Sequence, residues 1–225
     1  MVYKIMQSSK YRVFLESFLF TLVVFAIGFS LGYYVENSRN AAIEYNYQDN
    51  EIKALDLKLQ NYYYQIMDES ACEFAIEQNF VFADRIYNEG LEIEKAEEAN
   101  QITDNLLSQK KRYALLKTEL WLNAVLLKKK CNTPFDTIVY FFSNDNADNL
   151  KVAEQKIISN VLRDVKEEKG NKVILTPISG DLGIGIVDLQ ESVHNVTSLP
   201  TIIINENVKL EGFHNVSEIN SYLKY

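Results

Sequence analysis

The longest apolar run of the chain lies near its N-terminus, where no charged residue occurs from Ser17 to Val35. At about 1.5 Å per helical residue, a run of this length covers the roughly 30 Å hydrocarbon core of a membrane. Tyr33 and Tyr34 lie at its far end, where amphipathic aromatic side chains favour the membrane interface. The pattern predicts a transmembrane helix over residues 17–35. The alternative is a helix that is surrounded on every side by a large protein core.

The charges on either side of this span predict its orientation. Three basic residues precede it, namely Lys4, Lys10 and Arg12. The fifteen residues that follow carry Arg39 as their one basic residue beside three acids. By the positive-inside rule, we expect a single-pass protein of the cell membrane with residues 1–16 in the cytoplasm and the C-terminal part outside. An uncleaved signal anchor is favoured over a signal peptide cleaved after Gly32, because the apolar run continues through that position.

Residues 36–131 have the composition of a helical region. No proline occurs between Glu36 and Lys130, Gly90 is the one glycine, and good helix formers are frequent. Apolar side chains recur in alternating steps of three and four residues, as in a short coiled-coil seam: Ile52, Leu55, Leu59, Tyr62 and Ile66. We expect a stalk that continues the membrane helix, followed by a helical hairpin.

Two features of these helices are possible routes to a homodimer. Gly28 and Gly32 form a GxxxG pair inside the membrane span, which lets two helices approach closely. The coiled-coil seam of the stalk is the second route.

The two cysteines of the chain lie at matching distances from the turn that we expect at residues 100–102. Cys72 precedes Gln101 by 29 residues, and Cys131 follows it by 30. In an antiparallel hairpin the two residues would therefore lie side by side, and an oxidising compartment would join them in a disulfide. The alternative is two unpaired buried thiols, which would result if Gly90 interrupted the hairpin and shifted its register.

After Pro134 the pattern changes to short β-branched runs that alternate with amphipathic segments. We therefore expect residues 132–225 to form an α/β domain, so that the whole chain is of the α+β or α/β class. The expected order is strand, helix, strand, helix, strand, strand, helix (βαβαββα). The predicted strands are 137–142, 172–176, 201–204 and 208–210, and the predicted helices are 148–169, 182–194 and 215–223.

Parts of this region resemble the thioredoxin fold. The segment Asn195–Ile204 has a proline directly before its strand, and it resembles the signature in which a cis-proline precedes the third strand of that fold. The runs Tyr140–Ser143 and Val208–Phe213 are similar to its first core strand and to its last strand with the glycine that follows. The resemblance covers residues 132–225. It implies a thioredoxin-like domain with a peptide-binding groove beside Leu199 and Pro200.

The region in which thioredoxin-like oxidoreductases carry Cys-x-x-Cys contains no cysteine here. It includes Asn144, Asp145, Asp148 and Asn149, which suit the N-terminus of a helix but supply no thiolate nucleophile. We therefore expect a degenerate active-site loop that faces the groove. We predict no catalytic residue, no metal site and no cofactor.

The net charge of the chain limits the kinds of partner that it can bind. A net charge of −8 and a pI of about 4.9 disfavour nucleic acid. The sequence thus predicts a membrane-anchored, redox-inactive binding or scaffolding module with an unknown protein or peptide partner. Two alternatives stay open. One is a membrane-tethered thiol–disulfide oxidoreductase that uses Cys72 and Cys131, and the other is a purely structural envelope protein.

Overall fold

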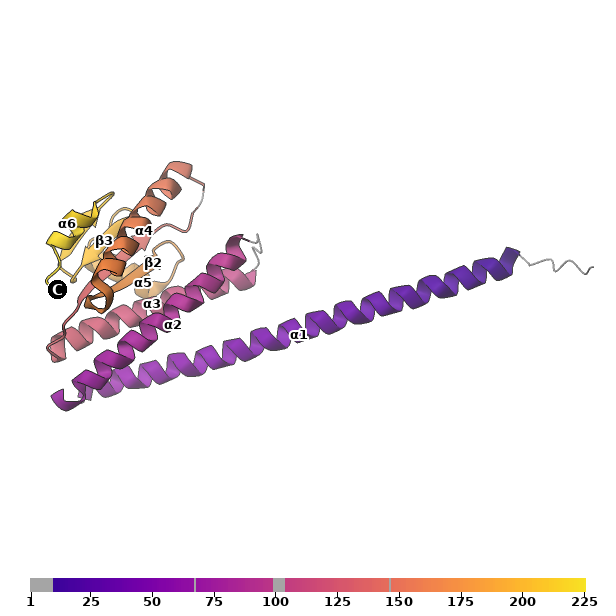
Figure 1. Ribbon diagram of the computed structural model, residues 1–225, viewed down its shortest axis with the longest axis horizontal. Helices are drawn as coiled ribbons and strands as arrows, with labels where there is room; N and C mark the ends of the chain where they lie inside the picture. The colour runs from indigo at the N-terminus through magenta and orange to yellow at the C-terminus, as the bar shows by residue number, and fades with distance from the viewer. Residues whose placement is uncertain (1–9, 67, 99–103, 146) are drawn as a thin grey trace, which may run out of the picture. The chain divides into compact units, whose positions relative to one another are not determined.

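The computed structural model describes residues 10–66, 68–98, 104–145 and 147–225. The chain divides into two compact units, Met1–Lys58 and Leu59–Tyr225. Helix α1 (Lys10–Ile66) forms the described part of the first unit, and its last residues belong to the second (Figure 1). Its segment Phe14–Tyr34 is long and apolar enough to cross a membrane, and its side chains are exposed. Lys4, which contributed to the predicted orientation, lies outside the described residues.

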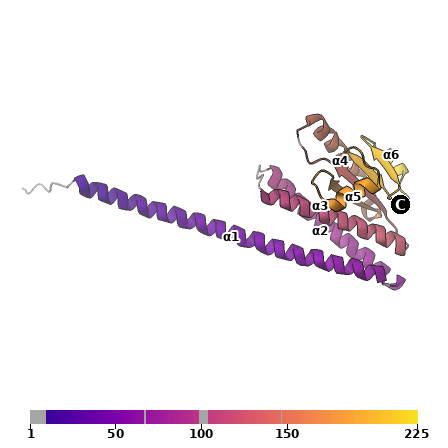
Figure 2. The ribbon, with the colours of Figure 1, turned by 180° about the vertical axis from the view of Figure 1, so that it is seen from behind.

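In the second unit, a 3₁₀ turn (Glu69–Ala71) leads into α2 (Cys72–Glu98), which is followed by α3 (Asp104–Lys130). The two helices lie side by side in both views of the ribbon (Figures 1 and 2). They are antiparallel, because a disulfide joins the start of α2 to the residue after α3, and Arg112 of α3 pairs with Glu89 of α2 at 2.6 Å. The predicted turn at residues 100–102 lies outside the described part of the chain.

The C-terminal part contains one mixed sheet of four strands, in the order of strands and helices that the sequence predicts. The strands are β1 (Asp136–Phe142), β2 (Val173–Ser179), β3 (Thr201–Ile204) and β4 (Val208–Glu211), and the helices are α4 (Asn149–Lys169), α5 (Gly185–Val193) and α6 (Val216–Ser221). The order across the sheet is β2-β1-β3-β4. Strands β1 and β2 are parallel, whereas β3 is antiparallel to both β1 and β4.

Two predicted boundaries were wrong. Strand β2 continues past Thr176 to Ser179 and includes Pro177, which pairs with Tyr140. A proline cannot donate a backbone hydrogen bond, but β2 lies at an edge of the sheet and has a neighbour on one side only. Helix α5 begins at Gly185 instead of residue 182, because Gly183 has a φ of +64°, which is not helical.

Different helices cover the two faces of the sheet. On one face, side chains of β1 and β3 pack against α4 and α6, in a core that includes Ile138, Tyr140, Ile158, Leu162, Val165, Ile202, Ile204 and Ile219. On the other face, Val139, Phe141, Ile178 and Ile203 pack against Trp121 of α3 and Val187 of α5. Trp121 is fully buried, and its ring makes an edge contact with that of Phe141. The second helix of the hairpin is therefore part of the core of the α/β region.

Candidate functional site

The carboxylate of Asp181 holds the loop that follows β1. It accepts hydrogen bonds from Ser143 Oγ at 2.6 Å and from the backbone N–H groups of Asn144 and Asp145 at 2.8 and 3.2 Å. Ser179 Oγ donates a further bond at 3.1 Å. Burial by itself raises the pKa of Asp181, but these hydrogen bonds outweigh it and lower the pKa below the ordinary value. The N–H groups at the end of β1 are thus already bound to a carboxylate of the protein.

Helices α4 and α3 fix the same loop from two other sides. Gln155 of α4 accepts the N–H of Ser143 at 2.6 Å and donates to its carbonyl at 3.1 Å. Asp148 caps α4 by accepting from the N–H of Leu150 at 3.0 Å. Lys110 of α3 donates to Asn144 Oδ1 at 2.8 Å. The loop is therefore held internally, and the helical hairpin reaches it through Lys110.

The Leu199–Pro200 peptide bond directly before β3 is cis. Leu199 lies beside Gly180, since a Cβ placed on Gly180 would come within 3.1 Å of Leu199 Cδ1. Gly180 immediately precedes Asp181, which binds Asn144 and Asp145. One short segment, residues 180–181, is thus in contact with the degenerate loop and lies beside Leu199. Asn149 starts α4 beyond the Asp148 cap.

The backbone of Leu199 makes no hydrogen bond within the described part of the chain. Neither its N–H nor its C=O has a hydrogen-bond partner among the residues that the structure describes, and its side chain is half-buried. The next carbonyl, of Pro200, accepts the N–H of Gly212 at 3.4 Å. Phe213, which follows Gly212, is largely exposed, as is Leu150 in the first turn of α4. Free backbone groups and exposed apolar side chains therefore occur together at this end of the sheet.

The surroundings of Leu199 are acidic. Glu191 of α5 lies beside Gly180, and its Oε1 atom is buried without a hydrogen-bond partner within the described residues. Burial, followed by the nearby carboxylates of Asp188 and Asp181, raises the pKa of Glu191. Asp145 is exposed on the loop.

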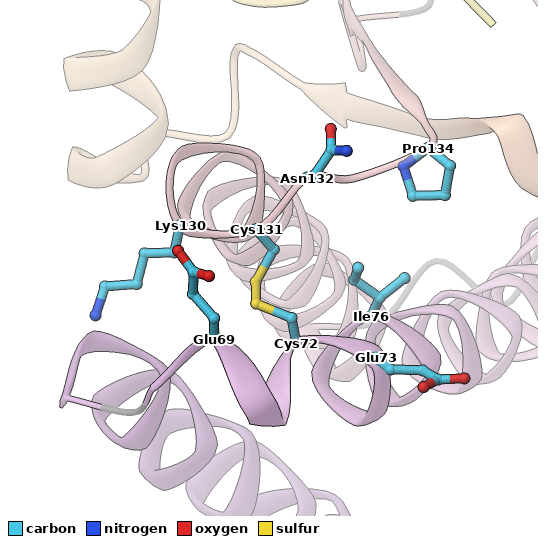
Figure 3. Close-up of a pocket in the computed structure, with 8 residues that line it drawn as sticks. All are labelled: Glu69, Cys72, Glu73, Ile76, Lys130, Cys131, Asn132 and Pro134. Carbon is cyan, nitrogen blue, oxygen red and sulfur yellow. A yellow bond between two sulfur atoms is a disulfide. The ribbon is translucent and has the colours of Figure 1, made fainter.

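The two cysteines form a disulfide with their Cα atoms 5.7 Å apart, which is the pairing predicted from the hairpin. It borders a groove of about 450 Å³ that is also lined by Glu69 and Glu73 (Figure 3). Cys131 is buried, and the ammonium group of Lys130 donates to the carbonyl of Gln65. Burial of Cys131 limits the access of an attacking thiolate to the disulfide. The geometry therefore suits a structural cross-link.

A second polar cluster, which sequence reasoning missed, lies at the opposite end of β1. Lys128 of α3 donates to Thr137 Oγ1, Asn205 Oδ1 and Glu206 Oε2 at 3.1, 2.6 and 3.0 Å. Glu206 also accepts from Trp121 Nε1 at 3.1 Å. The available signal was the spacing of seven residues between Trp121 and Lys128, which puts both on one face of α3.

The same cluster borders a groove of about 630 Å³ that reaches His194 at the end of α5. The His194 ring lies against Trp121, with ring centroids 5.3 Å apart, and burial lowers its pKa despite the nearby carboxylate of Glu206. Buried Asp136 accepts from Asn205 Nδ2 at 2.6 Å and from the N–H of Lys224 at 2.8 Å. Because these groups bind one another, the cluster fixes the β3–β4 turn and the end of the chain.

Comparison with known proteins assigns no family to the chain. No family model matches it, and no curated protein matches it. A solved structure described as that of a malarial protein is similar to it with 17% identity and a TM-score of 0.32, over 39% of this chain and 92% of the other. A likeness at this TM-score carries no argument about fold or function.

Proposed function

We propose that the chain is a membrane-anchored, redox-inactive protein of the thioredoxin-fold family that binds an extended protein or peptide segment beside Leu199. The mixed sheet, the order of its strands and helices, and the proline directly before β3 support the thioredoxin-like part of the proposal. The apolar segment of α1 and the basic residues before it support a single-pass anchor in the cell membrane with the C-terminal region outside.

The chemistry of the loop supports a role without redox catalysis. Its N–H groups bind Asp181, and its sequence contains no cysteine that could act as a nucleophile. The disulfide of the chain lies in the hairpin instead, beside two carboxylates. Thioredoxin-type exchange at the loop would require a thiolate nucleophile, and the loop has no cysteine to supply one.

The observation that carries the binding proposal is the unpaired backbone of Leu199. An extended segment that lay antiparallel to residues 198–200 would accept the Leu199 N–H and donate to its C=O, as in strand addition. Such bonds need no cysteine. Leu150 and Phe213 would add apolar contact, and the carboxylates around Asp145 would select against acidic segments.

The test is photo-crosslinking in native membranes from probes placed at positions 199 and 145. A probe at Lys156, which is exposed on α4, is the matched control. The proposal expects another polypeptide to be captured from 199 and 145 and not from 156. If 199 and 145 capture only the protein's own helices, the surface beside Leu199 is an internal docking surface and the proposal is wrong.

The alternative functions make different predictions. An oxidoreductase that used Cys72 and Cys131 would reduce the disulfides of insulin in the presence of a thiol donor, and the double Cys→Ser variant would not. A purely structural envelope protein would show neither that activity nor capture at position 199.

A further inference from the structure

The last turns of α1 have two apolar faces, and only one of them packs against other described residues of the chain. Tyr64 on one face is buried, and Asn61 donates a hydrogen bond to Asn123 of α3. On the opposite side, four large apolar side chains remain between 55% and 80% exposed: Leu55, Leu59, Tyr62 and Ile66. We call these four residues the exposed stripe. They are four of the five members of the seam predicted from the sequence, and more than half of each of these four side chains is left uncovered by the described residues.

The spacing of the exposed stripe specifies the shape of its partner. Successive members are four, three and four residues apart, so they stay on one side of the helix only for a neighbour that runs almost along the helix axis. A sheet edge or a crossing helix would contact one or two of them. The partner that covers all four is therefore a helix with the same heptad period.

We propose that the exposed stripe binds the same stripe of a second copy of the chain in a parallel, in-register pair. This inference rests on the proposed membrane anchor. Copies that enter one membrane in the same direction present identical stripes at the same height, so that Leu59 meets Leu59 and Tyr62 meets Tyr62. The stripe is only about 16 Å long at 1.5 Å per residue, which is short for a free coiled coil. Confinement to a membrane raises the effective concentration and compensates for this.

Charges beside the stripe provide a specific signature of the parallel pair. In heptad terms, Glu51 of one copy would lie near Asp56 of the other, and two carboxylates repel each other there. The substitution Glu51→Lys would turn this repulsion into attraction. It should therefore increase pairing, an effect that damage to the fold cannot imitate.

The experiment uses the full chain in phosphatidylcholine vesicles and a cysteine placed in the stripe by Tyr62→Cys. The matched control is Tyr87→Cys, a similarly exposed tyrosine on α2. After mild oxidation, we expect several-fold more intermolecular disulfide from position 62 than from position 87. Adding Leu59→Lys should abolish the product, whereas Leu189→Lys, at a comparably exposed leucine of α5, should not. Adding Glu51→Lys should increase it.

Three cross-linking results would overturn the inference, and vesicle flotation adds two more. The first is equal cross-linking from positions 62 and 87. The second is loss of the product in a Gly28→Leu and Gly32→Leu variant with the stripe intact, since the membrane helix would then form the dimer. The third is capture of a different protein from position 62 in native membranes.

Vesicle flotation tests the membrane anchor separately from the dimer. A floating chain without stripe cross-links contradicts the dimer alone, a chain that does not float contradicts the anchor and the dimer together, and neither result tests binding at Leu199.

Discussion

Lys117 offers the sharpest test of how the helical hairpin is packed. This side chain of α3 is buried, and its Nζ lies 4.0 Å from the centroid of the Tyr113 ring. No acidic side chain pairs with it in the described part of the chain. Burial lowers its pKa from 10.5 to about 7. The folded protein therefore holds Lys117 largely neutral above pH 7, whereas the unfolded chain keeps it charged up to about pH 10.

The sign of the pH dependence follows from this difference. Between pH 7 and pH 10.5 the unfolded state binds more protons than the folded state, so the free energy of unfolding rises with pH. With these two pKa values, the free energy of unfolding should rise by about 2 kcal/mol between pH 7 and pH 9. At pH 7 the burial of Lys117 lowers the free energy of unfolding by about 4 kcal/mol in total. Replacing it by methionine removes the ionisable group and keeps most of the volume. We expect Lys117→Met to stabilise the protein by about 2–4 kcal/mol at pH 7.

The assay is urea unfolding of the full chain in detergent, followed by the fluorescence of Trp121. This residue is the single tryptophan of the chain and is buried between α3 and the sheet. The control is Lys156→Met at an exposed lysine of α4. Measurements stay below pH 9.5, because burial also raises the pKa of Tyr113 and its ionisation in the unfolded chain has the opposite effect. Lys117 is not held neutral by burial if Lys117→Met is less stable than the original protein at pH 7, or if its free energy of unfolding rises as steeply between pH 7 and pH 9 as that of the original.

Three further changes test other parts of the fold. Replacing Cys72 and Cys131 by serine removes a cross-link between residues that are 59 positions apart in the sequence. In the absence of reductant, the double variant should have a free energy of unfolding about 4 kcal/mol lower than that of the original protein. With excess dithiothreitol, the difference between the two proteins should vanish. Gly90→Ala would place a Cβ 2.1 Å from the Tyr113 hydroxyl oxygen, and it should lower the thermal midpoint through a loss of about 1–3 kcal/mol. Asp181→Asn should lower the protection of the loop amides against hydrogen exchange, measured relative to their intrinsic exchange rates. In the original protein the same loss of protection should appear as the pH falls through the lowered pKa of Asp181; unchanged protection in both cases would contradict its role.

The sequence predicted features that depend on local patterns. Strand β1 was evident as a run of β-branched and aromatic residues, and α4 as a segment between the Asp148 cap and Gly170. The Cys72–Cys131 pairing followed from counting residues along an antiparallel hairpin. In each case neighbouring residues or a simple helical repeat carried the information.

Features that depend on tertiary contacts could not be predicted in this way. Asp181 binds amides that lie 36 and 37 residues earlier in the sequence, and nothing in its immediate surroundings indicates this. Trp121 of α3 packs against the sheet, so this helix buries apolar side chains on two sides. In the sequence, a helix that is apolar on two sides looks like a hairpin helix with one broad apolar face, and the contact with the sheet could therefore not be predicted. The exposure of the seam residues likewise depends on which face of α1 the hairpin covers.

The central claim is that the backbone of Leu199 hydrogen-bonds to an extended segment of another polypeptide. Hydrogen exchange at the Leu199 amide tests it most directly, by comparing the purified protein with the complex isolated from native membranes after crosslinking at position 145. We expect fast exchange in the purified protein, where this N–H has no partner among the described residues, and slow exchange in the complex. Equally fast exchange in both samples would contradict it.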